Sequence, residues 1–465
     1  MFQYQKGAFA TAANGRTTSL AEILCAFSYA LDLTEGQPEG HSLRACWIAA
    51  RLGRAIGLPE HALRDVYFAT LMKDLGCSSN AARVAEIYQT DDRSLKQGFK
   101  LVDGSLGQTL KFVLARTAQG EGWLRRARAI SNILRNGQTL VHELIQTRCT
   151  RGADIARQLR LPESVARAIH HLDEHWDGSG KPLGISGDAI PIGARVALLA
   201  QVADVYFTAS GPDVARAEIM RRGGSWLDPR LVEAFLEISA TPQFWVALTA
   251  EDIELQILML EPGPDLVTVD EDYLDDIVAA FGQVIDAKSP YTSGHSDRVG
   301  FYCDLVAAQL GHDAQQRRTL RRAAILHDVG KLGVSSAILE KPGKLEADEW
   351  HVMQGHALHT LRILERVGVL SEMATIAAAH HERLDGKGYP HNLDAATISL
   401  DTRIITVCDF FDALTADRPY RAAMSVEKAL EIMAGEVNVA LDPRCFEALR
   451  TVTANGLPTP SSLVA

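Results

Sequence analysis

Cysteine is sparse in this sequence and shows none of the spacings that structural cysteine sites use. The cysteines are odd in number and scattered, and no two of them form a CxxC pair. The seven are Cys25, Cys46, Cys77, Cys149, Cys303, Cys408 and Cys445. This pattern indicates neither a disulfide framework nor a thiolate zinc site, and it favours a reducing compartment.

Long apolar runs and an excess of basic residues are also missing. No run reaches the roughly 20 apolar residues that span a bilayer, and the N-terminal segment lacks the pattern of a secretory signal. The formal net charge of -11 argues against a long polyanion as a partner, because affinity for nucleic-acid backbones comes largely from Lys and Arg. We therefore expect a cytoplasmic protein with neither a membrane nor a polymeric nucleic acid as partner. A small anion held by a metal site is compatible with this charge.

Alternating patterns typical of β-strands are scarce. Most of the chain repeats apolar residues at the spacing of an amphipathic helix, for example in residues 21–33, 42–58 and 315–330. One candidate for a short extended piece is LQILMLE, at residues 255–261. The pattern predicts an all-α fold.

An internal repeat organises the chain. GHSLR at residues 40–44 matches GHSDR at 294–298, an offset of 254, and Asp74 matches Asp328 at the same offset. Further along, Asp177 matches Asp385 at an offset of 208. Repeats of this length indicate two related structural units.

The change of offset shows that the first copy is the longer one. It carries about 46 extra residues (254 minus 208) between Asp74 and Asp177, which we place at residues 79–105. We predict two tandem helical modules, at residues 1–265 and 266–465. PGPDLVTVDEDYLDD lies at their boundary and begins the first helix of the second module.

The second copy concentrates side chains that hold divalent metals. Its candidate ligands are His295, His327, Asp328, His356, His380, His381 and Asp409. A lone histidine on an apolar helix is more often structural, but adjacent helical residues point about 100° apart. The doublets His327-Asp328 and His380-His381 could therefore each address two neighbouring metals, which suits a dinuclear centre.

Several motifs of the second copy occur in the order found in a known family. They are KSPYTSGHSDRV, HDVGKLGV, ILEKPGKL, EWHVMQGH, HHERLDGKGYP and TRIITVCDFFDALTADRPYR, and they cover nearly all of residues 270–430. This text resembles the HD superfamily of metal-dependent phosphohydrolases and, within it, the HD-GYP cyclic-dinucleotide phosphodiesterases. The resemblance implies that all seven candidates are metal ligands, with Asp328 catalytic as the bridge between two metals.

The same resemblance implies further roles. Lys331 matches the catalytic lysine that supports the scissile phosphate, and the loop motif corresponds to Gly388, Tyr389 and Pro390. Arg418 and Arg421 are weaker candidates for phosphate contacts. Family members carry two or three iron or manganese ions. A third ion would need an upstream carboxylate, and here Asp286 stands where the family often has Glu.

The implied activity is hydrolysis of a cyclic dinucleotide, either cyclic di-GMP or 3',3'-cyclic GMP-AMP, by a metal-bound hydroxide. Two other readings stay open. The wider superfamily includes other nucleotide phosphohydrolases and di-iron oxygenases, although the GYP loop and the KPGKL segment argue against them. A non-catalytic receptor or signalling interaction protein is the second alternative.

The first copy keeps few of these residues. His41 and Asp74 stand for His295 and Asp328. At the other positions we pair Lys73 with His327, Cys77 with Lys331, Cys149 with His356, Leu172 and Asp173 with the His380-His381 doublet, Lys181 with Tyr389, and Gln201 with Asp409. A lysine at a ligand position opposes a cation nearby. We predict that this copy has lost its metals and is a scaffold or a regulatory module, contacting the second copy, another chain in a homodimer, or a signalling partner.

Overall fold

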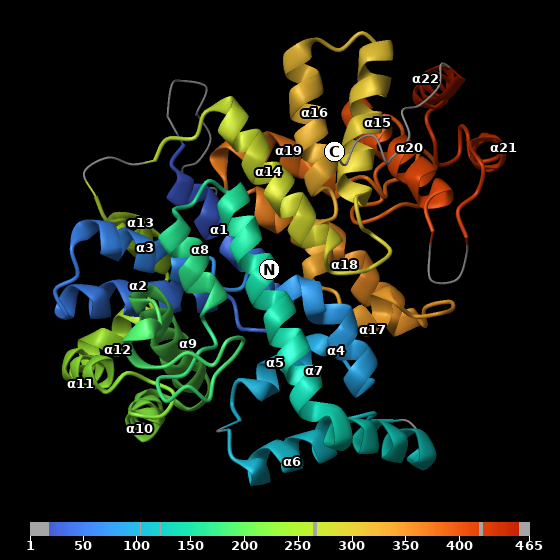
Figure 1. Ribbon diagram of the computed structural model, residues 1–465. Coiled ribbons are helices and arrows are strands. Elements are labelled where there is room, and N and C mark those ends of the chain that lie inside the picture. Colours follow the sequence, from blue (N-terminus) through green and yellow to red (C-terminus); the bar gives the residue numbers. More distant parts are fainter. Residues whose placement is uncertain (1–17, 103, 121, 264–266, 418–421, 455–465) are drawn as a thin grey trace, which may run out of the picture.

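The structure of this chain is a computed structural model that describes residues 18–102, 104–120, 122–263, 267–417 and 422–454 (Figure 1). Within these ranges it contains helices and isolated β-bridges but no β-strand, so the all-α prediction is confirmed. The first copy comprises α1 (Leu20–Thr34), α2 (His41–Ala55), α3 (Glu60–Leu71), η1 (Cys77–Asn80), α4 (Ala81–Tyr88), α5 (Asp92–Phe99), α6 (Leu106–Arg116), α7 (Trp123–Gln158), α8 (Glu163–His170), η2 (Gly187–Ala189), α9 (Ile192–Ser210), α10 (Pro212–Arg222), α11 (Pro229–Ile238), α12 (Pro242–Leu248) and α13 (Ile253–Leu260).

The second copy repeats much of this order in fewer residues. It comprises α14 (Glu271–Asp286), α15 (His295–Gln309), α16 (Ala314–Leu326), η3 (Val329–Gly333), α17 (Ser336–Leu339), α18 (Ala347–Leu364), η4 (Gly368–Leu370), α19 (Ser371–Ala378), α20 (Leu400–Thr415), α21 (Val426–Ala434) and α22 (Pro443–Ala454). The first helix begins within the acidic boundary segment, as expected, and at its start the Asp270 side chain accepts a hydrogen bond from the Tyr273 N–H.

One local prediction was wrong. Residues 255–261, expected to be extended, lie largely in α13. A short apolar run does not distinguish a strand from a buried helix. Its Leu and Met residues favour the helix, and Ile257 is buried against the core.

The two copies pack together around equivalent helices. Phe27 of α1 and Phe281 of α14 occupy matching positions at the offset of 254, and their rings stack with centroids 3.7 Å apart. Helix α1 packs on η3 and α18, while α14 packs on η1 and α7. Such reciprocal contacts are those of a two-fold dimer, here made within one chain. Figure 1 shows α1 and α14 between α2, α3 and α9–α12 on one side and α15 and α20–α22 on the other.

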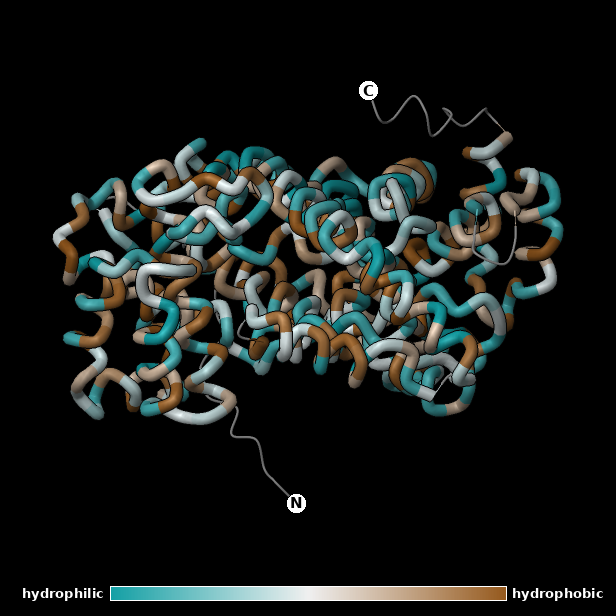
Figure 2. The backbone as a smooth tube through the Cα atoms, turned by 60° about the horizontal axis from the view of Figure 1, so that its bottom comes forward, coloured by the Kyte–Doolittle hydropathy of each residue, from teal (hydrophilic) through white to brown (hydrophobic). Residues whose placement is uncertain are grey.

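A continuous apolar core runs through both copies. One cluster of buried apolar side chains includes residues from α1 in the first copy to α22 in the second. Figure 2 shows apolar segments along the whole length of the elongated molecule. The predicted boundary between residues 265 and 266 stays a prediction. Wherever that boundary lies, the shared core couples the two copies.

The extra residues of the first copy lie later than expected. Gly76 approaches the carbonyl of Arg148 in α7 as Gly330 approaches that of His356 in α18. The second half of α7 therefore matches α18, and α4 contacts α17, its counterpart at the offset of 254. The additional elements are α5, α6 and the first half of α7. Because the extra segment has no counterpart in the second copy, no sequence match fixes its ends. The prediction of residues 79–105 therefore placed the extra segment too early in the chain.

Helix α5 of this extra segment contacts the second copy. The buried carboxylate of Asp92 accepts hydrogen bonds from Lys288 Nζ at 2.9 Å and from the Ser336 N–H at 2.7 Å. Arg93 Nη1 donates to the Gly333 carbonyl at 2.5 Å. The segment thus ties both the loop before α15 and the end of η3 to the first copy.

One helix of the described chain passes a length and composition test for crossing a membrane. It is α9, with 19 residues, and 67% of its apolar window is buried inside the fold. Burial of this kind is typical of a core helix. Helix α9 therefore does not contradict the expectation that the chain has no membrane-spanning segment.

Candidate metal centre

The fold brings all seven predicted ligands into one cluster. Five different segments supply them: the start of α15, the junction of α16 and η3, α18, the residues after α19, and α20. His295, His327, Asp328, His356 and His380 are buried, and His381 and Asp409 are partly exposed. A buried cluster of histidines and aspartates is costly unless the groups are compensated by one another or by a cation.

The cluster divides into two groups of donors around Asp328. One group is His295, His327 and Asp409, the other is His356, His380 and His381, and the ligand atoms of each group lie within 4.8 Å of one another. Asp328 Oδ2 is 3.6 Å from His295 Nε2 and 3.3 Å from His327 Nε2. Asp328 Oδ1 is 3.5 Å from His356 Nε2 and 3.7 Å from His380 Nε2. One carboxylate oxygen therefore faces each group, which is the position of a bridging ligand.

Backbone carbonyls hold three of the imidazoles in the orientation a metal needs. Nδ1 of His327, His356 and His380 lies 2.6, 2.5 and 2.6 Å from the carbonyl oxygen three residues earlier. A carbonyl only accepts, so Nδ1 donates and Nε2 carries the lone pair. These three Nε2 atoms and Asp328 Oδ1 are buried without a hydrogen-bond partner. Buried orphan acceptors that converge in this way fit divalent cations.

The doublets lie at helix ends and not within helices as expected. His327 follows the last residue of α16, and His380-His381 follow α19. The last carbonyls of a helix have no partner within it. The Nδ1–H groups of His327 and His380 satisfy one such carbonyl each, so the same contact ends the helix and orients the ligand.

The electrostatics of the cluster favour a cation. Burial alone would lower the pKa of His295, but hydrogen bonds to Asp328 and Asp412 outweigh it and raise that pKa to about 10. Burial also opposes the charge of Asp328, yet His327 and Lys331 hold its pKa well below the usual range. Burial lowers the pKa of His356 to about 4, which keeps it neutral at pH 7. Neutral His356 beside the ionised Asp328 therefore has the protonation state that a metal ligand requires, whereas His295 would release its proton to the solvent when a cation binds.

A supporting carboxylate behind His295 was missed from the sequence. Asp412 Oδ2 lies 2.7 Å from His295 Nδ1, and Arg298 Nε donates to Asp412 Oδ1 at 2.7 Å. The first copy keeps the same arrangement, since Asp204 contacts His41 Nδ1 at 2.6 Å. Asp204 and Asp412 match at the offset of 208, and this retained pair was the signal that could have found them.

The other predicted residues border the cluster. Lys331 Nζ lies 2.5 Å from Asp328 Oδ2, and its side chain is 22% exposed. The ring of Tyr389 lies 4.7 Å from that of His381, and a Cβ added at Gly388 would lie 2.6 Å from the His381 carbonyl oxygen. The GYP loop therefore packs directly on the doublet, with Pro390 joined to Tyr389 by a cis peptide bond. Arg418 and Arg421 lie outside the described residues.

Asp286, the candidate for a third ion, has a different role in this structure. Its Oδ1 accepts hydrogen bonds from the Ser296 N–H at 3.2 Å and from the Ser296 hydroxyl at 2.7 Å. Asp32 makes the same two contacts with Ser42 in the first copy. Because the contact persists in the copy without the metal ligands, capping of the α15 N-terminus accounts for Asp286.

In the first copy, cationic side chains stand where metals would be. Lys73 forms a buried ion pair with Asp74, and Lys100 Nζ lies 3.9 Å from Asp74 Oδ1 and 3.0 Å from Glu35 Oε2. Burial would raise the pKa of Asp74, but Lys100 and Lys73 hold it well below its usual range. Glu35, Asp74 and Cys77 are close enough to hold an ion, but the ammonium groups already supply the positive charge.

The counterpart of His356 is Arg148, which corrects the choice of Cys149. The matching approaches of Gly76 and Gly330 fix this register. Arg148 forms an ion pair with Asp173, the residue at the position of His381. The error was a slip of one residue, because the sequence around α7 offers no motif that fixes the register there. An arginine cannot be deprotonated to serve as a ligand.

The titration of His41 gives a pH test of this arrangement. Burial and the charge of Lys73 lower its pKa from 6.5 to about 4, although Asp204 opposes them. The unfolded chain therefore binds more protons between these pH values, and the stability due to neutral His41 is lost as pH falls from about 6.5 to about 4. Between pH 7 and pH 4.5 we expect the unfolding free energy of wild type to fall by about 2 kcal/mol more than that of His41→Gln. Denaturant titration at the two pH values measures this difference.

The matched control for this test is His61→Gln. His61 is exposed on α3, so its replacement should leave the wild-type pH dependence unchanged. Equal slopes for wild type and His41→Gln would contradict the assignment of a neutral, buried His41.

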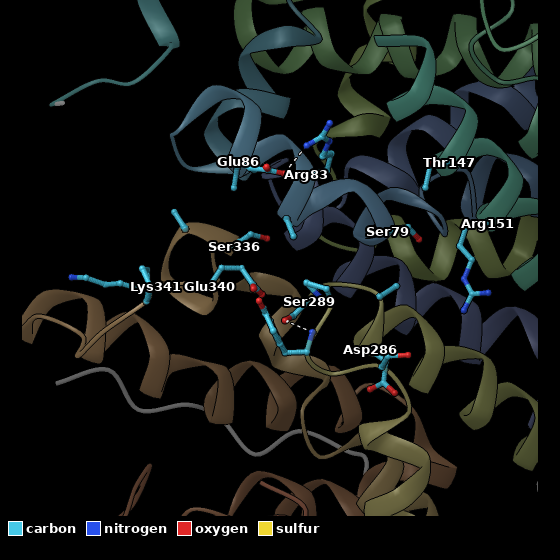
Figure 3. A pocket seen from close by; sticks show the side chains of 18 of the residues that line it. Ser79, Arg83, Glu86, Thr147, Arg151, Asp286, Ser289, Ser336, Glu340 and Lys341 are labelled. Atoms are coloured by element: carbon cyan, nitrogen blue, oxygen red, sulfur yellow. Dashed lines mark hydrogen bonds and ion pairs between the residues drawn. The ribbon is translucent and has the colours of Figure 1, made fainter. Parts of the chain in front are cut away.

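A large cavity lies between the copies, beside the cluster. Its volume is ≈ 1440 Å³, and Figure 3 shows that Ser79, Arg83 and Glu86 face it from the first copy, and Ser289 and Glu340 from the second. Its wall includes Gly294, the residue before the ligand His295. The cavity therefore reaches the residues behind His295, but none of the seven predicted ligands lines it.

Known proteins resemble both copies of this chain. A family model described as HD domain matches residues 105–231 and 280–445. A protein named 3'3'-cGAMP-specific phosphodiesterase 3, from Vibrio cholerae serotype O1, is 50% identical over 434 residues, which are 93% of this chain and 94% of that protein. A cyclic di-GMP phosphodiesterase from Thermotoga maritima is 32% identical over 201 residues, which are 43% of this chain and 55% of that protein. The chain thus spans about half the length of this second relative.

A solved structure shares the whole architecture. It is the crystal structure of a Vibrio cholerae phosphodiesterase described as specific for cyclic GMP-AMP, V-cGAP3. It matches with a TM-score of 0.65 and 45% sequence identity, over 95% of this chain and 99% of that chain.

Proposed function

This chain belongs to the HD-domain family of phosphodiesterases, and from that membership and the geometry of its second copy we propose that it hydrolyses a cyclic dinucleotide at a centre of divalent metal ions. The observation that carries the proposal is the convergence of seven histidine and aspartate side chains, four of whose buried atoms lack a partner. The enzymatic activity of the relatives supports it.

The second copy's residues divide the work among themselves. His295, His327 and Asp409 would hold one ion, His356, His380 and His381 the other, and Asp328 both. When bound, such ions polarise a phosphoryl oxygen and activate water at neutral pH. Asp412 keeps His295 in the orientation and tautomer that a ligand needs. Lys331, at the exposed edge of the cluster, would place positive charge beside the scissile phosphate.

The GYP loop and the cavity would bind the rest of the substrate. Tyr389 packs against His381 and lies 6.0 Å from the ring of Trp350, which is 47% exposed. These rings form an apolar border beside the ligands. The cavity between the copies, which residues of both copies line, adds space for the rest of a dinucleotide.

For the substrate we propose 3',3'-cyclic GMP-AMP, with cyclic di-GMP as the second candidate. The first is supported by the 50% identity to a phosphodiesterase named for that substrate, over nearly the whole of both chains. The second is supported by the 32% identity to a cyclic di-GMP phosphodiesterase, over less than half of this chain.

We propose iron or manganese as the metal and two or three ions, two of them held by the seven predicted ligands. The donors are nitrogen and oxygen without thiolate, which suits both metals.

We place the enzyme in the cytoplasm, in line with the seven free, buried cysteines. For the first copy we propose a scaffold or regulatory role, supported by its ion-paired vestigial site and its contacts through α5.

The test is turnover of both dinucleotides by protein loaded with manganese or, anaerobically, with iron. We expect linear products from both, with kcat/KM at least about ten-fold higher for 3',3'-cyclic GMP-AMP. Products are identified by chromatography and metal content is measured on the same sample. If the loaded protein binds both dinucleotides and leaves them intact, it is a receptor and the proposal is wrong.

A further inference from the structure

The segment inserted in the first copy exposes apolar side chains to solvent. We call residues 104–135, which contain α6 and the start of α7, the inserted hairpin. On α6, Leu106 is 89% exposed, and Leu110 and Leu114 are each 43% exposed. Residues four apart lie on one face of a helix, so the three leucines form a stripe along α6. An exposed stripe of this kind marks an interaction site more often than isolated apolar residues do.

The start of α7 adds larger apolar groups together with arginines. Trp123 is 76% exposed and Leu124 is 65% exposed. Arg128 and Arg135 are also exposed. They follow Leu124 by four and eleven residues, which places them on the same face of the helix. This face therefore mixes apolar and cationic side chains.

The inserted hairpin is basic in an acidic protein. It contains six basic residues and one acidic residue, a net charge of +5, whereas the whole chain carries -11. The remaining residues therefore carry -16. A basic segment of this kind attracts anionic partners electrostatically.

The inserted hairpin lies at an edge of the molecule, away from the metal centre. In Figure 1, α6 lies along the lower edge, and α15, α16 and α20 lie in the upper part. The hairpin packs inward through a small separate core that includes Val84, Val113 and Ile133. Its outward face is thus free to meet a partner without disturbing this core.

The charge of the hairpin argues against a second copy of this chain as the occupant. A two-fold contact brings the same surface of both molecules together. Two hairpins of charge +5 would then face each other, with Arg128 and Arg135 near the contact. An exposed tryptophan, a leucine stripe and flanking arginines are instead the composition of helices that lie in the interface of anionic membranes.

We propose that the inserted hairpin docks this protein on the surface of an anionic lipid bilayer. Trp123 and Leu124 would enter the headgroup region, and the arginines would pair with lipid phosphates. The prediction of no membrane partner was based on the absence of a spanning segment, and surface docking requires none. The proposal is independent of the substrate and of the metal centre.

The test uses the full chain and co-sedimentation with vesicles. We expect binding to vesicles of phosphatidylcholine and phosphatidylglycerol at about 7:3, weak binding to phosphatidylcholine alone, and loss of binding from about 0.05 M to about 0.5 M salt. The double variant Trp123→Ser with Leu124→Ser should lower the partition coefficient at least about ten-fold. Arg128→Glu with Arg135→Glu should lower it by a similar factor.

A matched control separates docking from general surface hydrophobicity. Val246 and Met259 are 65% and 69% exposed outside the hairpin, and replacing both by serine should leave binding unchanged. All variants should hydrolyse soluble substrate as wild type does, which keeps this test apart from that of the catalytic proposal. The docking proposal is wrong if the wild type does not bind anionic vesicles, or if the hairpin substitutions act by dissociating a dimer.

Discussion

Replacing Asp328 by alanine is expected to remove bound metal and to lower kcat/KM by more than about 10³-fold. Among the described residues, Asp328 is the carboxylate whose two oxygens face both groups of histidines, at 3.3 to 3.7 Å from four Nε2 atoms. Its loss would remove a ligand from each ion at once, and would leave Lys331 without its counter-charge. The measurements are metal content per chain and hydrolysis of the preferred dinucleotide.

The matched variant in the first copy is Asp74→Ala. Asp74 occupies the equivalent position but pairs with Lys73 and Lys100. We expect the metal content per chain and the identity of the products to stay those of wild type. The unfolding free energy should fall by about 3 kcal/mol, because two ammonium groups lose their buried partner. A halving of metal content in Asp74→Ala would show that the first copy also holds metal.

Replacing Lys331 by methionine is expected to lower kcat by about 10²- to 10³-fold while metal is retained. Methionine keeps much of the apolar stem and removes only the charge. Lys331 is not a ligand candidate, because its Nζ is a cation 2.5 Å from Asp328 Oδ2. Removing it takes away positive charge that would stabilise the transition state, but no donor to the metals. Metal content near that of wild type with a lowered kcat is the expected signature.

Lys428→Met serves as the control for Lys331→Met. Lys428 forms an exposed ion pair with Glu431, so its loss should change kcat little. If Lys331→Met loses metal in proportion to activity, the lysine supports the integrity of the centre and not the phosphate, and the proposed role is wrong.

The sequence predicted the seven side chains that converge in the cluster, because they occur in short motifs. The doublets, the isolated His295, His356 and Asp409, and the lysine after Asp328 all have fixed neighbours that identify them in a single sequence. The supporting Asp412 has no such motif, since it is one acid in the run DFFDALTAD. Its role depends on the approach of α15 to α20, which a one-dimensional pattern does not reveal.

The register of the first copy was predicted well where glycines and charged residues were retained, and poorly where they were not. Asp74, Lys73 and Asp173 occupy the positions that the offsets gave. Arg148 was missed by one residue, because α7 continues for 36 residues through the insertion and offers no local mark. Long helices repeat too regularly to fix a register by themselves.

By itself the sequence determined the helical class and the repeat, and it predicted the ligands of the second copy and their loss in the first. These follow from residue type and spacing, which are properties of the chain. Only the tertiary structure decided how Asp328 faces both groups of histidines, how Phe27 meets Phe281, and how α5 and the inserted hairpin are placed. Those features depend on contacts between residues distant in sequence, and such contacts are chosen by packing of the whole core and not by any local pattern.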